Sequence, residues 1–463
     1  MINSKPELRA EYSLNNLVYF IRLSALGLLL LTLFVETKRG LNDYQMLDIF
    51  SLMQGGWLNI PLLPGMSVSF FSFGWFPAFI EIFNVLAFVL LFLKPTHRAS
   101  YILAASALVM RNVCSHLTVG VHTTSVFLIP LLLLGLEPPN KENSAKIRQR
   151  LIVAIALMYL FSALVKMNPT FLSGVVVENS FLYRRSLKTF LDWLATFKAT
   201  ILLGPLLEFF AFFVIFKKTR KAALLCALVF HMAVSIWIFL SVGLTVFGCS
   251  LLFLVTQEQD LKVYYRRLIY ISVAVTAVLF GLNFTFAESW AHYQTIVYDG
   301  VSIAMAAVAT FGALAILLKL KNEPVNYVSI PGILLPVTYV GLSFALGWPE
   351  PFGYTQYAGL RGTSYAIVLP LHEVEKHPRV HRLIRRWRTR GLSFSASNEF
   401  VAIFPTLTMS KNFIDYYAQL EPHCEYKLYT SNTRENFERL VRDYSFRRSS
   451  FETLPRLLCV DEN

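Results

Sequence analysis

A single lysine stands near the end of a long apolar segment of the chain. The segment starts near Leu151 and closes at Asn168-Pro169, about one helical turn after Lys166. A lysine inside a membrane helix costs about 2.5–3.5 kcal/mol on insertion scales, so it is expected to have a partner or a chemical role. Two interpretations follow. The amine reaches the membrane surface on its flexible stem, or it is held away from water, where the neutral amine is favoured and can act as a general base.

Further polar residues lie within or beside other apolar segments. They are Arg111, Asn112, His122, Glu208 and His231. His122 is either a second group of the same chemical site or a helix-start residue bound by loop backbone. Glu208 and His231 either support that site or form a hydrogen-bonded pair that joins two helices, since a carboxylate commonly orients an imidazole.

The composition determines the class of protein. The chain has 463 residues, of which 55% are hydrophobic and 15% charged, and this excludes an ordinary soluble globular protein. The long apolar runs predict an all-α polytopic membrane protein with about nine to eleven transmembrane helices. The net charge of +13 does not indicate a nucleic-acid partner, because Lys and Arg in short loops set membrane orientation. The cysteines show no metal or redox spacing, so no metal is expected.

The candidate spans share an apolar length that can cross or nearly cross a bilayer. They cover residues 17–35, 75–93, 99–113, 119–136, 150–167, 200–216, 222–239, 242–256, 268–286, 300–318 and 329–346. Basic clusters fall in alternate connections, which predicts a cytoplasmic N-terminus in an inner membrane. An odd number of spans then places the region after Gly347 outside. In this topology Lys166, His122 and Glu208 lie in the outer half of the bilayer.

The interior acidic residue Glu81 belongs to the same outer half. It is either a protonated packing residue or the partner of Arg22 or Arg111. Arg22 lies close enough to the inner surface to extend toward it.

The composition changes after residue 350. We therefore expect a helical membrane bundle over residues 1–350 and a small basic α+β region over 351–463. Within the second region, residues 364–371 and 399–407 are typical of strands, and residues 382–390 and 431–445 of helices. Cys424 and Cys459 are able to pair if this region is extracytoplasmic.

Two segments of the first region carry a family resemblance. Tyr159-Leu-Phe-Ser-Ala-Leu-Val-Lys166, with Gly174 after it, resembles the tyrosine, lysine and glycine pattern of the vitamin K-dependent gamma-carboxylases. Bacterial relatives of these enzymes carry the HTTM (horizontally transferred transmembrane) domain. The segment from Pro205-Leu-Leu-Glu208 to Phe230-His231 is similar to the acidic residue, basic turn and Phe-His run of the family.

A third, shorter match completes the resemblance. Arg111-Asn112 and His122 resemble the Arg-Asn of HTTM proteins and the histidine before the fourth helix of the carboxylases. The matches together cover residues 20–250, about half of the chain. The chain departs from the pattern at Asn168, where the family has an acid, and at the added Pro169.

The resemblance implies a reaction. It gives Lys166 the role of the base that deprotonates a reduced quinone resembling vitamin K hydroquinone, with help from His122 and support from Glu208, His231, Arg111 and Asn112. The product of quinol oxidation then removes a proton from a peptide glutamate, and carbon dioxide adds. About a hundred residues replace the family's large substrate-recognition part. A non-catalytic membrane binding or assembly partner, or a small-solute carrier, therefore stays open as the alternative function.

Overall fold

Helices predominate in the computed structural model. It describes residues 6–33, 60–115, 122–167, 172, 198–237, 242–285, 291–320, 326–345, 363–377, 380, 393–396, 399–404, 407–420, 427–432 and 455–457. The helical class that the composition predicts is confirmed in these residues.

Each of the eleven apolar segments expected from the sequence coincides with a helix. These helices are α1 (Pro6–Leu33), α4 (Trp75–Leu93), α5 (Arg98–Ser115), α6 (His122–Leu136), α7 (Ser144–Lys166), α11 (Lys198–Phe212), α12 (Arg220–Trp237), α13 (Val242–Val255), α14 (Lys262–Thr285), α15 (Ala291–Lys319) and α16 (Ile330–Ala345). The short helix α3 (Val68–Ser72) precedes α4, and the 3-10 turn η1 (Phe213–Ile215) extends α11.

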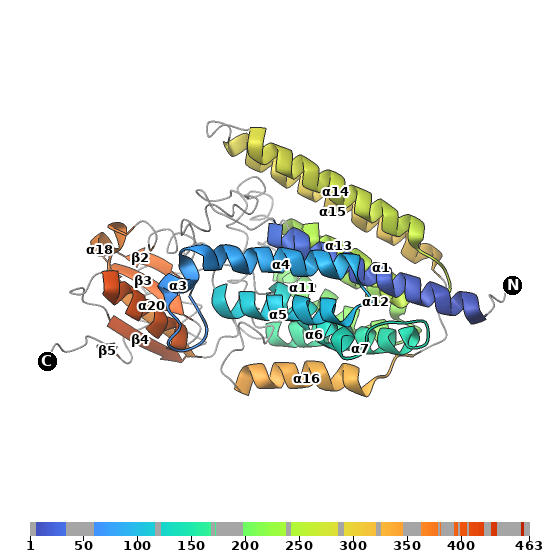
Figure 1. Ribbon diagram of the computed structural model, residues 1–463, viewed down its shortest axis with the longest axis horizontal. Helices are drawn as coiled ribbons and strands as arrows, with labels where there is room; N and C mark the ends of the chain where they lie inside the picture. The colour runs from blue at the N-terminus through green and yellow to red at the C-terminus, as the bar shows by residue number, and fades with distance from the viewer. Residues whose placement is uncertain are drawn as a thin grey trace.

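The long helices lie roughly along one axis and form a bundle (Figure 1). Helices α14 and α15 run along one edge, and α16 runs along the opposite edge. The chain starts at one end of the bundle, here called the N-terminal end, and the strands lie beyond the other, the sheet end. Helices α1 and α7 begin beside each other, since the Ser144 hydroxyl lies 3.3 Å from that of Ser13. Both helices then run toward the sheet end.

Two glycines bring α1 and α13 into backbone contact. A Cβ atom added to Gly27 would lie 2.9 Å from the carbonyl oxygen of Gly243, and one added to Gly243 would meet the carbonyl oxygen of Gly27. Small residues at such crossings let membrane helices approach closely, so that dispersion contacts hold them together. No larger side chain fits at this crossing without moving one helix.

Arg148 connects α7 to α1 and to the end of α13 inside the N-terminal end of the bundle. Its side chain is fully buried, and its Nη1 donates to the carbonyl oxygens of Phe253, Leu254 and Thr256 at 3.0, 2.8 and 2.6 Å. Its Nη2 donates to the carbonyl oxygen of Ser13. The last carbonyls of α13 have no partner within their own helix, and the guanidinium supplies one.

Asn16 makes a second connection at this end. Its Nδ2 donates to the carbonyl oxygens of Thr256 and Gln259 at 3.0 and 2.8 Å, and its Oδ1 accepts from the amide of Leu261 at 3.1 Å. The first helix thus satisfies the polar backbone between α13 and α14. Burying that backbone without partners would be costly in an apolar environment.

The C-terminal region contains a five-stranded antiparallel sheet. Its strands are β1 (Thr363–Pro370), β2 (Ser393–Ala396), β3 (Glu399–Phe404), β4 (Lys427–Asn432) and β5 (Pro455–Leu457), in the spatial order β2-β3-β1-β4-β5. Helix α18 (Leu371–Glu375) follows β1, and α20 (Leu407–Leu420) buries Met409, Phe413 and Tyr417.

The sequence predicts this region in part. The expected strands at 364–371 and 399–407 correspond to β1 and β3, each of which ends earlier than expected. The helix expected over 431–445 is wrong at its start, because residues 431–432 pair with β1 as the end of β4. The rest of that segment, residues 382–390, Cys424 and Cys459 lie outside the described residues.

Helix α20 connects the sheet to the bundle. The Asn412 side chain donates to the carbonyl oxygens of Pro61 and Leu63 at 3.0 and 2.9 Å, just before α3. The rings of Phe73 and Tyr416 lie 6.2 Å apart between centroids. The sheet region therefore contacts the segment that leads into α4.

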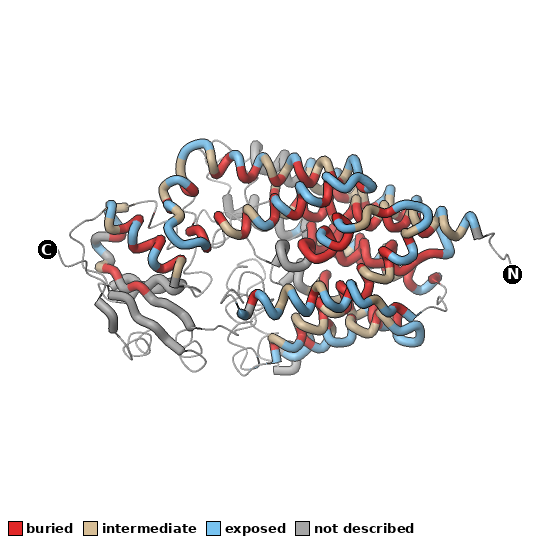
Figure 2. The backbone as a smooth tube through the Cα atoms, turned by 60° about the horizontal axis from the view of Figure 1, so that its bottom comes forward, coloured by how far each residue is buried: buried red, intermediate tan, exposed pale blue. Residues whose placement is uncertain are grey.

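Buried residues line the inward sides of the helices, and exposed residues lie on their outer sides (Figure 2). Many residues of both kinds are large and apolar. Three described helices, Glu7–Leu33, Trp75–Leu93 and Ser144–Lys166, are long and apolar enough to cross a membrane by length and composition. Shorter apolar helices cover residues 127–136, 202–215, 243–255, 303–319 and 330–343. Large apolar side chains are exposed on peripheral helices, such as Phe311 at 64%, Leu318 at 81% and Leu334 at 58%.

Candidate functional site

Helix α7 presents a row of polar side chains on one face near the sheet end. Tyr159, Ser162 and Lys166 are spaced by three and four residues, which places them one above another on a helix. Lys166 is the last residue of α7, and Met167 ends the helix just before Asn168-Pro169. A residue before proline is disfavoured in the helical conformation, which is consistent with this end.

Lys166 is held by a carboxylate from the neighbouring helix α11. Its Nζ lies 2.6 Å from both carboxylate oxygens of Glu208 and donates to the hydroxyl of Ser162 at 2.9 Å. The Ser162 hydroxyl donates in turn to Glu208 at 2.7 Å. The side chains of Lys166 and Glu208 are 11% and 3% exposed. Of the two interpretations of this lysine, the geometry favours a buried amine over one extended to the surface.

An aromatic ring lies against the same amine. The Nζ of Lys166 is 5.5 Å from the ring centroid of Phe230 on α12, within the range of a cation–π contact. Phe230 also contacts Tyr159, with ring centroids 6.4 Å apart and planes nearly perpendicular. The ring is thus placed beside both ends of the polar row.

Tyr159 pairs with His231, one residue further along α12. The Tyr159 oxygen and the Nε2 of His231 are 2.5 Å apart, and both side chains are buried. The expected pair between Glu208 and His231 is therefore wrong. Glu208 on α11 contacts Lys166 and Ser162. His231 on α12 instead contacts Tyr159, which lies earlier on α7.

A second buried ion pair joins α4 and α5. The Nε of Arg111 lies 3.2 Å from a carboxylate oxygen of Glu81, and its Nη1 donates to the Thr32 hydroxyl of α1 at 3.1 Å. Of the two partners considered for Glu81, the structure selects Arg111. Arg22 instead donates its Nε to the carbonyl oxygen of Phe92 at 3.1 Å.

Two further predicted site residues belong to α5 and α6. Asn112 is buried beside Arg111 in α5. His122 is the first residue of α6, and its side chain lies outside the described residues. The structure thus brings together Lys166, Glu208 and, through Tyr159, His231.

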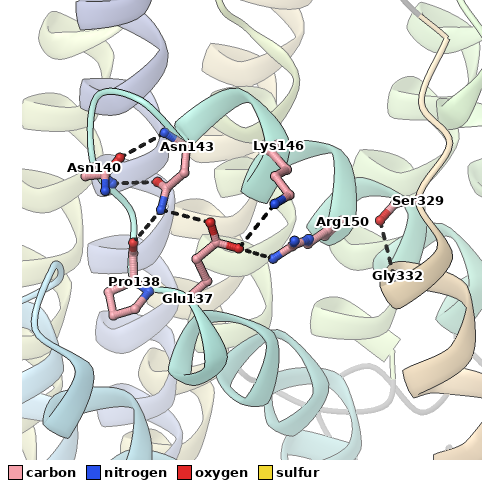
Figure 3. Close-up of polar contacts among 8 residues, drawn as sticks. All are labelled: Glu137, Pro138, Asn140, Asn143, Lys146, Arg150, Ser329 and Gly332. Atoms are coloured by element: carbon pink, nitrogen blue, oxygen red, sulfur yellow. Dashed lines mark hydrogen bonds and ion pairs between the residues drawn. The ribbon is translucent and has the colours of Figure 1, made fainter.

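The opposite end of α7 is fixed by a charged turn (Figure 3). Glu137 accepts a hydrogen bond from Arg150 and lies 3.8 Å from the Nζ of Lys146. The Nδ2 of Asn143 also donates to it, at 3.3 Å. The Arg150 hydrogen bond is the largest cause that lowers the pKa of Glu137 below its ordinary value.

Helix α16 begins against this turn. Figure 3 shows Gly332 beside Arg150, and a Cβ on Gly332 would lie 2.6 Å from the Arg150 carbonyl oxygen. The close approach holds α16 on α7 at the N-terminal end. The contacts of Glu137 and of Gly332 hold α7 in place along the axis of the bundle. They therefore also help to position Lys166.

The chemistry of the site is that of protons and hydrogen bonds. Among the described residues, no group of three or more His, Cys, Asp or Glu side chains is placed to hold a metal ion. A lysine, a carboxylate, a serine, a tyrosine and a histidine are groups that donate, accept or transfer protons.

The chain was compared with known proteins. No family model, no curated protein and no solved structure matches it.

Proposed function

We propose that the chain is an integral protein of the cytoplasmic (inner) membrane, with its N-terminus inside and its C-terminal sheet outside. The apolar side chains exposed on peripheral helices would contact lipid, since they leave a surface unsuited to water. The basic turns with Lys146 and Arg150 lie at the end opposite the sheet, as the positive-inside rule requires. In this orientation Lys166 lies near the outer face.

The function that this geometry supports best is that of an enzyme acting on a lipid-soluble quinol at the outer face, with Lys166 as the base. The single observation behind it is the buried amine of Lys166 bound to Glu208. The position suits a substrate that arrives through the lipid. The pair is flanked by Leu164 on α7, Met167 just after α7 and Phe210 on α11, which are 53%, 44% and 51% exposed.

Glu208 gives Lys166 the means to act as a base. A paired ammonium cannot accept a proton, so it must first lose one. Transfer of a proton from Nζ to the Glu208 carboxylate, 2.6 Å away, leaves a neutral amine and a carboxylic acid. Ser162 stays hydrogen-bonded to the pair and keeps it aligned. The amine then accepts the hydroxyl proton of the quinol.

The resemblance to the gamma-carboxylases extends the proposal to a peptide. The quinol would supply the reducing equivalents, and with oxygen a strong base, for carboxylation of a glutamate side chain. His122, Arg111 and Asn112 would support this site from α5 and α6. The C-terminal sheet, which contacts the bundle through Asn412, would lie on the side where an extracytoplasmic peptide arrives.

The test separates the charge of Lys166 from its basicity. Arginine keeps the positive charge and the carboxylate contact but does not give up its proton at physiological pH. Lys166→Arg in membranes should therefore keep the fold and lose quinol oxidation and labelled-bicarbonate incorporation into peptide. Both would be measured against the wild type and Lys146→Arg, a control at an exposed lysine. Equal turnover by Lys166→Arg and the wild type would disprove the role of the base.

One observation favours a second function, that of a non-catalytic membrane binding or assembly partner, or a small-solute carrier. The Lys166–Glu208 pair is satisfied internally and joins α7 to α11, as a purely structural pair would be. In that case the sheet region would be the docking surface. Replacing the pair by Lys166→Met/Glu208→Leu would leave partner capture intact, while deleting residues 372–463 would abolish it. Capture that survives the deletion would exclude this function.

A further inference from the structure

The half-buried Arg22 of α1 lies between the end of α4 and the start of α14. Its Nε donates to the carbonyl oxygen of Phe92 in the last turn of α4, and its guanidinium carbon lies 6.0 Å from the centroid of the Phe92 ring. The guanidinium is also within hydrogen-bonding reach of the Tyr265 hydroxyl, in the first turn of α14. Arg22 therefore contacts two helices at one level of the bundle.

The charge of Arg22 is not neutralised by any carboxylate of the described residues, since none lies within 4.0 Å of it. The hydroxyl of Tyr19, one turn before Arg22, is close enough to be affected by the charges of both Arg22 and Arg266. The carboxylate of Asp260 acts on it as well, but its Oδ1 already accepts from the Lys262 amide at 2.9 Å. The surroundings of Tyr19 thus keep an excess of positive charge.

Two tyrosines form an aromatic wall beside the arginine. The half-buried rings of Tyr19 and Tyr265 stack with centroids 4.4 Å apart, and Phe253 meets both rings edge to face. Tyrosine suits a membrane interface because its ring is apolar and its hydroxyl is polar. The stack places two hydroxyl groups, each a hydrogen-bond donor, near the Arg22 guanidinium.

An apolar face of α4 ends at the same level. Phe79, Leu86 and Leu93 follow one another at seven-residue spacing, which places them along one side of the helix, and they are 44%, 60% and 60% exposed. Lys94 follows directly and ends the helix. In the proposed membrane this face contacts acyl chains over about 21 Å and then reaches the level of Arg22, where the headgroups begin.

We propose that Arg22, Tyr19 and Tyr265 bind the phosphate of one anionic phospholipid of the cytoplasmic leaflet. The planar N–H groups of the guanidinium match two phosphate oxygens, and a phenol hydroxyl donates to a third. A zwitterionic headgroup carries the same phosphate, but the exposed cations Lys94 and Arg266 at this end repel its own positive charge. The inference rests on the proposed membrane orientation and is independent of the proposed reaction.

The test measures lipid affinity with the full-length protein in detergent micelles. Phosphatidylglycerol and phosphatidylcholine are titrated separately, and the first bound lipid is quantified by native mass spectrometry. The wild type should bind phosphatidylglycerol more tightly than phosphatidylcholine. Arg22→Gln should weaken the binding of phosphatidylglycerol about fivefold, the effect of one arginine near the membrane surface, and leave that of phosphatidylcholine nearly unchanged.

The matched control is Arg9→Gln, because Arg9 is an exposed arginine on the same helix that already has a carboxylate partner in Glu258. It should bind both lipids as the wild type does. A second variant covers the case in which Arg22→Gln fails to fold. Tyr265→Phe keeps the arginine and the stacked ring but removes one hydroxyl, and it should weaken phosphatidylglycerol binding about threefold.

Three results would overturn the inference. The first is equal affinity of the wild type for the two lipids, or folded Arg22 and Tyr265 variants that bind phosphatidylglycerol as the wild type does. The second is an equal loss in Arg9→Gln, which would mean that net charge alone attracts the lipid. The third is displacement of phosphatidylglycerol by inorganic phosphate, which would make the ligand a soluble anion. A protein that stays in solution without detergent would instead disprove the proposed membrane location.

Discussion

Arg111 and Glu81 face each other 3.2 Å apart inside the bundle, near the same end as Lys166 and Glu208. Each pair joins two helices, α4 to α5 and α7 to α11. Buried ion pairs of this kind are costly to break, because the remaining charge has no solvent to stabilise it. The helices at the sheet end therefore depend on two charged connections.

Arg111→Leu should destabilise the protein by about 3–5 kcal/mol, because it leaves the Glu81 carboxylate buried without its partner. The free energy of unfolding would be measured by SDS titration in mixed micelles. The double variant Arg111→Leu/Glu81→Leu should recover most of the loss. The control is Arg9→Leu, which breaks an ion pair with Glu258 whose side chains are 41% and 40% exposed. That change should cost less than about 1 kcal/mol, and an equal cost at both sites would contradict the burial argument.

Lys166→Met should cost about 3–5 kcal/mol in the same measurement for the same reason. Adding Glu208→Leu should bring stability to within about 1 kcal/mol of the wild type, while quinol turnover stays absent. Stability and activity would then separate in one variant. A double variant as unstable as Lys166→Met alone would mean that the pair is not the source of the loss.

Gly243→Ala should destabilise the α1–α13 crossing by about 1–3 kcal/mol, because the new methyl group overlaps the Gly27 carbonyl. Gly204→Ala is the matched control, since nothing lies within 4 Å of a Cβ built on that helical glycine. The control should be neutral or stabilising by up to about 1 kcal/mol, because alanine favours a helix over glycine. Thermal unfolding of the two variants side by side gives the comparison.

The lowered pKa of Glu137 predicts that the stability of the protein depends on pH. Its pKa is lowered in the folded protein below the ordinary value of 4.5, chiefly by the Arg150 hydrogen bond. The unfolded chain therefore binds the proton first as the pH falls. The contribution of Glu137 should be full above pH 4.5 and should decline as the pH falls through the lower folded value.

The measurement is the difference in unfolding free energy between the wild type and Glu137→Gln, from pH 7 to pH 3. The difference should be about 0.5–1 kcal/mol at neutral pH, because the carboxylate is partly exposed, and it should shrink in acid. The matched control is Glu142→Gln, at an exposed acidic residue of the same turn. A difference that grows in acid would have the wrong sign.

The helices could be predicted because their signal is long and strong. A run such as residues 75–93 is apolar along its whole length, and the helix α4 has the same bounds. The strands β2 and β5 have four and three residues, too few for alternation to be distinguished from a loop. β4 begins with Lys427 and ends with Ser431 and Asn432, and its pairing with β1 is what makes it a strand.

The site could be predicted as a set of residues but not as a set of contacts. Lys166, Glu208 and His231 stand out because ionisable groups are rare in apolar helices. Which of them pair depends on how α11 and α12 rotate about their axes, and spacing within one helix does not specify this. Ser162 and Tyr159, at four and seven residues before Lys166, could have been found from helical geometry alone.

Arg148 was missed for a different reason. It belongs to the basic cluster at residues 141–150, which indicates membrane orientation as a group. Yet it precedes Leu151, Ile152 and Ile155 by three, four and seven residues, which places it on the apolar face of α7. An arginine on that face is expected to have buried partners, and it has four backbone carbonyls.

The hydrogen bonds of Asn16 determine when the first helix is able to complete its packing during biosynthesis. Its hydrogen-bond partners Thr256 and Gln259 lie 240 and 243 residues further along the chain. At about 5–20 residues per second, the ribosome completes that stretch roughly 12–50 s after making Asn16. In the proposed membrane topology, the first helix therefore waits with the Asn16 side-chain amide unpaired until the segment after α13 has been made. The N-terminal end of the bundle is therefore completed late, once α13 with Gly243 is available to pack against α1.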